Sequence, residues 1–98
     1  IGAPDILEAD GKIHDAYRIQ FIREHLQQMR LAITDGVQIL GYCPWAAIDV
    51  VSTHQGYRKR YGFIYVDREE FDLKELKRFR KDSFYWYANV ILENGQNL

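Results

Sequence analysis

The stretch of sequence that determines the fold is residues 41–67, GYCPWAAIDVVSTHQGYRKRYGFIYVD. It opens with the end of an apolar run, Val37–Tyr42, whose alternate side chains would face opposite sides of a strand. It closes with a second run of this kind, Tyr61–Val66. The two predicted strands are joined by residues 45–59, and connections of this length in compact domains are usually functional or disordered.

A helix is expected before these strands, over Asp15–Asp35. Its apolar side chains recur at intervals of three and four, which places them on one helix face; they are Ile19, Ile22, Leu26, Met29 and Ile33. The Asp15 carboxylate can accept from the free N–H groups of the first turn. Gly36 can adopt the left-handed conformation that ends a helix.

The order of helix, glycine turn and strand is the second half of a β-α-β crossover. We therefore predict an α/β fold in which residues 1–98 form a single segment that starts with a loop. Residues 67–81 are expected to form a polar connection after the second strand. A second helix then runs from a cap at Asp82 or Ser83 to Glu93, where Asn94-Gly95 ends it.

The composition excludes several classes of protein. A chain of 98 residues supports one hydrophobic core, and a formal net charge of −1 disfavours a globally basic nucleic-acid binder. Cys43 is the only cysteine, so an internal disulfide is impossible. No apolar run approaches the ~20 residues of a membrane span. Because the first residue is Ile1 rather than Met, we expect a piece of a longer protein.

Several chemical signals have a plainer interpretation. The basic stretch Lys74–Lys81 could bind an anionic partner, but the near-zero net charge favours a solvated connection. His14 and His25 are three helical turns apart, roughly 16 Å, so they cannot share a metal ion. Cys43 has no adjacent base and is expected to be an unreactive thiol. Glu93 precedes Asn94-Gly95 at a helix end, which favours capping over catalysis.

The long connection carries residues of another kind. Ser52, Lys59 and Tyr61 supply a hydroxyl, an ammonium and a phenol, three donors that suit a phosphate group. Trp45 follows the first predicted strand, where an indole can stack on a sugar ring or pack in the core. In parallel α/β sheets, ligands bind beyond the carboxyl ends of the strands. Because these residue types are also common at surfaces, the pattern alone leaves both interpretations open.

Residues 41–67 resemble a segment of glycoside hydrolase family 1. In that family a GYxxW strand end precedes an Asp, a sugar-contacting loop and an (R/K)(F/Y)GFxYVD stretch. The start of the last predicted helix, KDSFYWY (81–87), is similar to the family pattern K-x-S-x-x-W-Y, and residues 17–37 resemble the seventh barrel helix. The resemblance implies the C-terminal quarter of a (β/α)8 TIM barrel, with two strands and two main helices.

The same resemblance implies a subgroup. Ordinary β-glucosidases of the family carry Glu-Trp where this chain has Ser52-Thr53. The spacing of Ser52, Lys59 and Tyr61 resembles the S-x6-K-x-Y of 6-phospho-β-glycosidases, in which these side chains hold the 6-phosphate; a Glu there would repel a dianion. The resemblance also implies that Trp45 stacks on the glycone ring. Thr53 stands where phospho-β-galactosidases tend to carry Trp, which favours a gluco-configured substrate.

The implied function is the C-terminal portion of a retaining 6-phospho-β-glucosidase that acts on 6-phospho-β-D-glucosides in the cytoplasm, without metal or organic cofactor. Such enzymes use two carboxylates about 5 Å apart. The acid/base motif Asn-Glu-Pro is absent, and Ile1–Asp5 resembles the stretch that follows the nucleophile motif Glu-Asn-Gly. We therefore expect the chain alone to be inactive. Asp49 and Glu93, the nearest acidic substitutes, match neither motif.

Two alternatives stay open at this point. One is a non-catalytic phosphosugar-binding or assembly module, and the other is a nucleic-acid module built on Lys74–Lys81, although we expect neither a nucleic acid nor a membrane as partner. We also expect the isolated chain to self-associate, because strands taken from a closed barrel regain unpaired edges. Its large aromatic side chains are more than such a piece can bury; they are Tyr42, Trp45, Phe63, Tyr65, Phe84 and Trp86.

Overall fold

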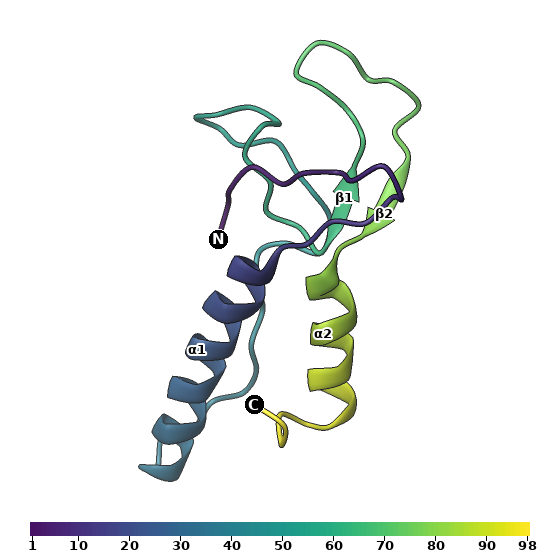
Figure 1. Cartoon of the computed structure of the whole chain (residues 1–98). Helices are drawn as coiled ribbons and strands as arrows, with labels where there is room; N and C mark the ends of the chain where they lie inside the picture. Colours follow the sequence, from purple (N-terminus) through teal and green to yellow (C-terminus); the bar gives the residue numbers. More distant parts are fainter.

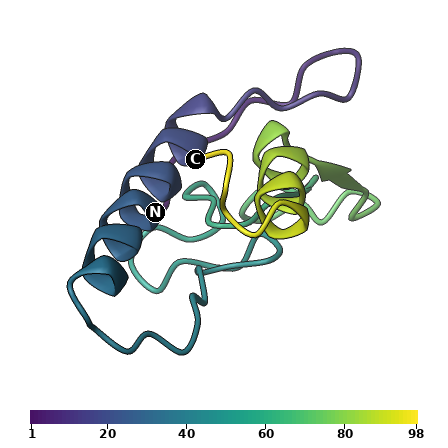
Figure 2. The same cartoon turned by 90° about the horizontal axis from the view of Figure 1, so that it is seen from below.

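Two helices carry a small hairpin sheet at one end in the computed structural model, which describes all residues 1–98 (Figure 1). The order of elements is α1 (Ala16–Thr34), β1 (Ile64–Val66), β2 (Arg78–Arg80) and α2 (Asp82–Leu92). Both helices start at the hairpin end and run away from it side by side, as the views in Figures 1 and 2 agree. The α/β class predicted from the sequence is confirmed, and so is the number of main helices.

Helix α1 follows the predicted apolar stripe over most of its length. Ile22 and Leu26 are buried, whereas Ile33 near its end is 49% exposed. The helix ends as expected, because Gly36 adopts a positive φ of 95° and Val37 N–H donates to Ala32 O at 3.0 Å.

The start of α2 corrects the predicted caps. Its N-cap position is Lys81 rather than Asp82 or Ser83, and no local side chain caps it. Asp15, predicted to cap α1, makes no such bond there. Its carboxylate accepts instead from the backbone N–H of Ser83 at 2.9 Å, and Ile13 O accepts from Asp82 N–H at 3.0 Å. The residues just before α1 therefore cap α2, although they are distant in the sequence. They accept from N–H groups in the first turn of α2 that have no partner within the helix.

The strands differ more from the sequence prediction. Of the predicted strand Tyr61–Val66, only Ile64–Val66 is regular, and its antiparallel partner is β2, with Tyr65 opposite Phe79. β2 lies inside the predicted polar connection 67–81. Val37–Tyr42 is not a strand, because no other segment pairs its backbone with it to form a ladder. The single parallel bridge in this part of the molecule joins Ile48 to Ile64.

The apolar core is small and lies between the helices and the strand end. Ile22, Leu26, Phe63 and Val90 form its centre, and the Phe63 and Tyr87 rings stack with centroids 4.9 Å apart. Only 15 of the 98 residues are buried. The radius of gyration is 15.0 Å, against about 13 Å for a compact domain of this length. The molecule is therefore more open than a closed domain of the same size.

The chain ends follow the sequence expectations. Asn94 and Gly95 have positive φ angles of 50° and 72°, so Glu93–Gly95 is a helix end as predicted. The tail then returns toward α1, where the Arg30 side chain donates to Gly95 O (Figure 2). Neither helix combines the length and the apolar character that crossing a membrane requires.

Candidate functional site

The loop between Asp49 and Gly62 is closed at its base by one buried carboxylate. Asp49 Oδ1 accepts from Gly62 N–H at 3.0 Å, and Oδ2 accepts from Val66 N–H at 3.3 Å. Asp49 N–H itself donates to Ile64 O at 2.9 Å. A Cβ on Gly62 would collide with the backbone of Ile48 and Asp49, so this crossing requires glycine. Both ends of the loop are thus held together.

Ser52 organises the first turn of this loop. Its backbone exchanges two hydrogen bonds with Gly56, and its Oγ accepts from the N–H groups of His54 at 3.3 Å and Gln55 at 3.1 Å. The residue is only 6% exposed. A serine hydroxyl has two acceptor positions and one proton. The Tyr61 hydroxyl also donates to this oxygen, so Ser52 accepts in all of these bonds and its own proton is not used in the turn.

Lys59 and Tyr61 lie beside Ser52, as their spacing predicts. The Tyr61 hydroxyl is 3.4 Å from Ser52 Oγ, and the Lys59 Nζ is 5.5 Å from the centroid of the Tyr61 ring. The hydrogen bond with Ser52, and then Lys59, lowers the pKa of the Tyr61 phenol. Lys74, Lys77 and Lys81 pair with carboxylates, whereas Lys59 forms no ion pair.

The N-terminal segment supports this cluster from behind. Ala3 exchanges two backbone hydrogen bonds with Arg60, at 3.1 and 2.9 Å. A Cβ on Gly2 would lie 2.5 Å from Tyr61 Cε1 and 2.7 Å from Lys59 Cε, so residue 2 packs directly against both side chains. A larger side chain here would move the ammonium and the phenol.

No side-chain hydrogen bond or ion pair joins Trp45 or Thr53 to the three donors. Trp45 is 68% exposed, so the indole is not a core residue in this chain. Thr53 is exposed, and its hydroxyl lies 3.0 Å from His54 Nδ1. The structure thus brings Ser52, Lys59 and Tyr61 together, while the two residues predicted for the glycone stay on the open surface.

Beneath the loop lies a buried network of charges that the sequence did not reveal. It alternates three carboxylates with three cations, all with side chains at most 7% exposed; in order they are Asp15, Arg18, Asp5, Lys81, Asp49 and Arg60. The N···O distances run from 2.6 to 3.1 Å. The opposite charges balance, which is what full burial of ionised groups requires.

Lys81 shows why this network was missed. It ends the basic stretch Lys74–Lys81, which the net charge suggested was solvated. Arg78 and Arg80 are exposed as expected, but Lys81 is 0% exposed, with Nζ 2.7 Å from both Asp5 and Asp49. Its partners are 76 and 32 residues away. Along residues 78–81, alternate side chains are exposed and turned inward, as in a strand. Lys81 falls on the inward side of this alternation, which is what distinguishes it from Arg78 and Arg80.

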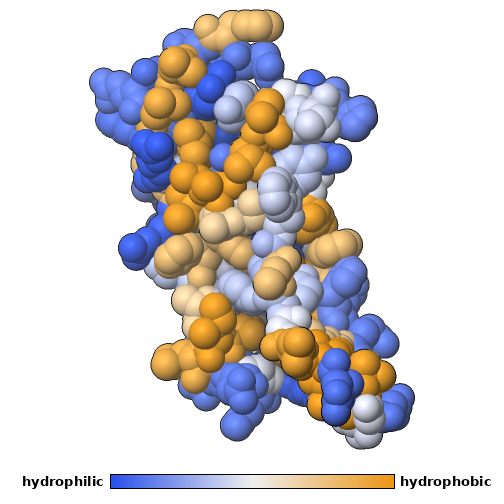
Figure 3. All heavy atoms as spheres, turned by 180° about the vertical axis from the view of Figure 1, so that it is seen from behind, coloured by the Kyte–Doolittle hydropathy of each residue, from blue (hydrophilic) through white to orange (hydrophobic).

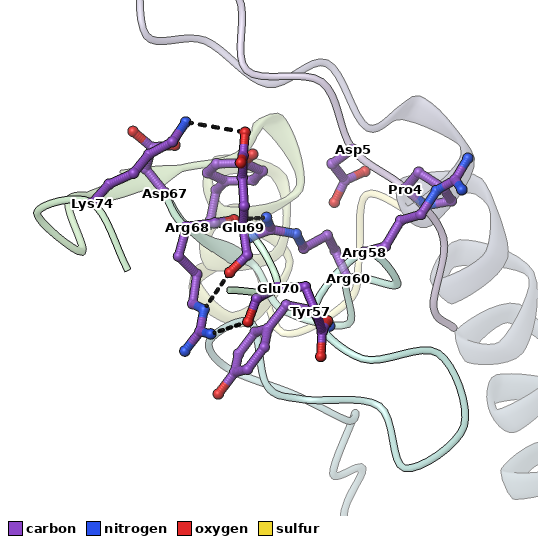
Figure 4. A pocket seen from close by; sticks show the side chains of 11 residues that line it. Pro4, Asp5, Tyr57, Arg58, Arg60, Asp67, Arg68, Glu69, Glu70 and Lys74 are labelled. Atoms are coloured by element: carbon purple, nitrogen blue, oxygen red, sulfur yellow. Dashed lines mark hydrogen bonds and ion pairs between the residues drawn. The ribbon is translucent and has the colours of Figure 1, made fainter. Parts of the chain in front are cut away.

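A polar pocket of about 280 Å³ lies beside the network (Figure 4). Arg60 extends toward Arg68 along one side of it, whereas Arg58 points the opposite way. The Arg68 guanidinium lies 3.7 Å from the centroid of the Tyr57 ring. Because the pocket's charged groups are mostly engaged with one another, it offers no free set of donors.

The two acidic residues considered as catalytic substitutes are placed differently. The Asp49 side chain is 0% exposed and accepts from two backbone N–H groups and two cations. Glu93 is the C-cap of α2, at the opposite end of the molecule from the loop. Neither residue therefore offers a free carboxylate beside the Ser52, Lys59 and Tyr61 cluster.

Comparison with known proteins gives this arrangement a context. Residues 1–96 match the sequence profile of Glycosyl hydrolase family 1. An aryl-phospho-β-D-glucosidase of Bacillus subtilis is 53% identical over 91% of this chain and 19% of its own length. A phospho-cellobiase of Klebsiella oxytoca is 52% identical over 100% of this chain and 21% of its own length.

The fold agrees with these sequence matches. The family 1 β-glucosidase from Thermotoga maritima superposes with a TM-score of 0.86 at 39% identity, over 96% of this chain and 20% of its own. Fold and sequence together define a segment of a glycosidase. The chain belongs to glycosyl hydrolase family 1. It spans about a fifth of the length of the relatives it matches.

Proposed function

We propose that this chain supplies the phosphate and glycone subsite of a retaining 6-phospho-β-glucosidase that hydrolyses 6-phospho-β-D-glucosides. The observation that carries the proposal is the cluster of Ser52, Lys59 and Tyr61, three hydrogen-bond donors on one loop. Two relatives that are about half identical in sequence, an aryl-phospho-β-D-glucosidase and a phospho-cellobiase, support a phosphorylated substrate.

The proposed roles follow from the chemistry of each donor. Lys59 supplies the positive charge, and no carboxylate competes for it. Ser52 donates the hydroxyl proton that its turn leaves available. Tyr61 adds a phenolic hydroxyl beside them, which donates to Ser52 Oγ in this structure. Charge-assisted bonds from three directions discriminate a phosphate dianion from a neutral hydroxymethyl group.

The glycone is proposed to lie next to this cluster, over the exposed face of Trp45, with Thr53 at its rim. An indole stacks well on the apolar face of a pyranose ring. Thr53 is small, which supports the gluco configuration. No metal or organic cofactor takes part in these contacts.

We propose that residues 1–98 act as a single segment, the last strands and helices of a (β/α)8 barrel. The parallel direction of α1 and α2 supports this placement (Figure 1), and so does the superposition on the Thermotoga maritima enzyme. The chain spans about a fifth of the length of its relatives, which is less than the quarter of a barrel expected from the sequence. Val37–Tyr42 would become a strand once neighbours lie on both sides of it.

The two catalytic carboxylates of a retaining glycosidase would come from the rest of the barrel. The chain alone would hold the sugar phosphate without cleaving it. We place the reaction in the cytoplasm, because a charged sugar phosphate does not cross a bilayer unaided.

The isolated chain is proposed to self-associate. Apolar side chains gather in several patches on the face shown in Figure 3. An apolar cavity of about 460 Å³ opens between α2 and the segment at Tyr42, and Leu40 beside it is fully exposed. Apolar surface of this extent normally finds a partner.

The test of the proposed function is Lys59→Ala in a complete family 1 barrel that carries residues 1–98. Loss of the ammonium should cost about 2–4 kcal/mol in kcat/KM for an aryl 6-phospho-β-glucoside. The same variant should hydrolyse the unphosphorylated glucoside as before. Lys77→Ala, which removes an exposed lysine paired with Glu75, is the matched control. Equal losses on both substrates would contradict the phosphate assignment.

A further inference from the structure

We propose that the buried Asp49–Arg60 ion pair is a positioning device for the phosphate-binding side chains. The pair sits below the loop and is nearly fully buried, with side chains 0% and 7% exposed for Asp49 and Arg60, and it is not itself one of the proposed phosphate ligands. The inference rests on the proposed function, because it assigns the pair a role in placing Ser52, Lys59 and Tyr61.

Asp49 joins the two ends of the loop. Its carboxylate holds Gly62 N–H and Val66 N–H beyond the loop, while its own peptide precedes the Ser52 turn. The side chain is 0% exposed and also accepts from Arg60 at 3.1 Å and Lys81 at 2.7 Å. One carboxylate therefore sets the distance between the turn that carries Ser52 and the stretch that carries Lys59 and Tyr61.

Arg60 lies between the two residues it would position. Successive side chains of an extended chain point to opposite faces, so an inward Arg60 turns Lys59 and Tyr61 outward together. The Arg60 guanidinium is anchored by Asp49 and by the carbonyl oxygens of Val66 and Arg68. These bonds hold the side chain from three directions.

The backbone of Arg60 is fixed as firmly as its side chain. Ala3 pairs with it on both sides of the peptide, and the Arg18 guanidinium donates to its carbonyl at 2.9 Å. Arg60 is 6% exposed. Neighbouring Cα atoms are only 3.8 Å apart across a peptide bond, so any displacement of Arg60 moves Lys59 and Tyr61 with it.

A charged pair suits positioning better than stabilisation. Buried ion pairs contribute little net stability, because desolvation opposes the Coulomb attraction. Their hydrogen bonds are directional, however, and a planar guanidinium bound to a carboxylate and two carbonyls has one favoured placement. A misplacement of about 1 Å can reduce a rate roughly 100-fold.

The experiment compares Asp49→Asn with Asp15→Asn in the complete barrel that carries residues 1–98. Both residues are buried carboxylates of the same network, and each accepts from a cation and from backbone N–H groups. Only Asp49 contacts the loop. The readouts are kcat and KM for an aryl 6-phospho-β-glucoside and for the unphosphorylated aryl glucoside.

We expect Asp49→Asn to lower the phosphorylated-to-unphosphorylated ratio of kcat/KM about tenfold, mainly through KM for the phosphorylated substrate. Asp15→Asn should leave that ratio within about twofold, even if the protein becomes less stable. If both variants change both substrates equally, the network is structural only and the inference is overturned.

Arg60→Lys keeps the inference testable if Asp49→Asn fails to fold. It keeps the charge but cannot reach Asp49, Val66 O and Arg68 O at once. A selective rise in KM for the phosphorylated substrate supports the positioning role, and an equal rise for both substrates overturns it. Lys59→Ala distinguishes failure of the proposed function from failure of this inference. If Lys59→Ala also affects both substrates equally, the proposed function fails. If Lys59→Ala is the only variant that selectively affects the phosphorylated substrate, only this inference fails.

Discussion

Ser52 performs two tasks with one hydroxyl group. Its oxygen accepts from two backbone N–H groups and stabilises the turn, and it also accepts from the Tyr61 hydroxyl at 3.4 Å. The turn therefore uses a serine for its own geometry, and the proposed phosphate site would use the same hydroxyl. The residue types alone left the grouping of these three residues open, and the resemblance to the family spacing S-x6-K-x-Y predicted it; all three lie within ten consecutive residues of one closed loop.

The selectivity between epimers is a prediction at the scale of one residue. Thr53 is small and exposed, so the complete barrel carrying this chain should prefer aryl 6-phospho-β-D-glucoside over the galactoside in kcat/KM. Thr53→Trp should reduce that preference roughly tenfold or more, because it changes the shape and the donors beside one hydroxyl. A wild-type preference for the galactoside would contradict this reading of Thr53 while leaving the family assignment intact.

At the scale of elements, the helices and the strands differ in what stabilises them. α1 and α2 satisfy their backbone groups internally, so an apolar period and an end signal such as Gly36 or Asn94-Gly95 predict them well. Val37–Tyr42 has the pattern of a strand but no neighbour to pair with. The sequence did not predict β2, because Arg78–Arg80 is mostly polar and pairs with β1 over only three residues.

The cap that Asp15 provides to α2 can be tested by substitution. Asp15→Ala leaves the Ser83 N–H without an acceptor and the Arg18 guanidinium with one carboxylate fewer. Breaking a buried pair in this way should destabilise the complete barrel by about 3–5 kcal/mol. Urea-induced unfolding followed by circular dichroism measures the loss.

Asp35→Ala is the matched control for this prediction. Asp35 is the exposed C-cap of α1, and its side chain makes no hydrogen bond or ion pair. Its removal should change stability by no more than about 0.5 kcal/mol. Equal effects of the two substitutions would show that the contact between Asp15 and α2 contributes nothing.

At the scale of the whole molecule, an open shape accompanies a small core. The molecule measures 49 × 30 × 18 Å, and eleven of its large apolar side chains are at least half exposed. The charge network joins the N-terminal segment, α1, the loop and the start of α2, in addition to the apolar core between the helices. Two predictions follow from this distribution.

The first is that the 98-residue chain hydrolyses no glycoside by itself. General-acid and nucleophilic steps each need a positioned carboxylate, and Asp49 is already bound by four donors. The assay is release of a chromophore from an aryl 6-phospho-β-glucoside by the purified chain. Turnover that disappears on substitution of Asp49 or Glu93 would refute the prediction.

The second is that the purified chain self-associates at micromolar concentrations. Leu40, Trp45 and Leu92 are 104%, 68% and 80% exposed, and burying such side chains against a second copy is favourable. Sedimentation equilibrium measures the mass, and Leu40→Glu should weaken the association. A compact monomer with a cooperative thermal transition would show that the chain covers these surfaces internally.

The sequence by itself determined the features that depend on near neighbours. The helix faces and the C-terminal helix ends follow from residues close in the chain, and so does the Ser52, Lys59 and Tyr61 cluster; the motifs of residues 41–67 are specific enough to indicate the family. Tertiary structure alone decided the rest. The acceptor that caps α2 is 68 residues away in Asp15, and the partners that bury Lys81 are Asp5 and Asp49. Buried polar groups must find partners wherever the fold brings them, and no local pattern records which distant residue that will be.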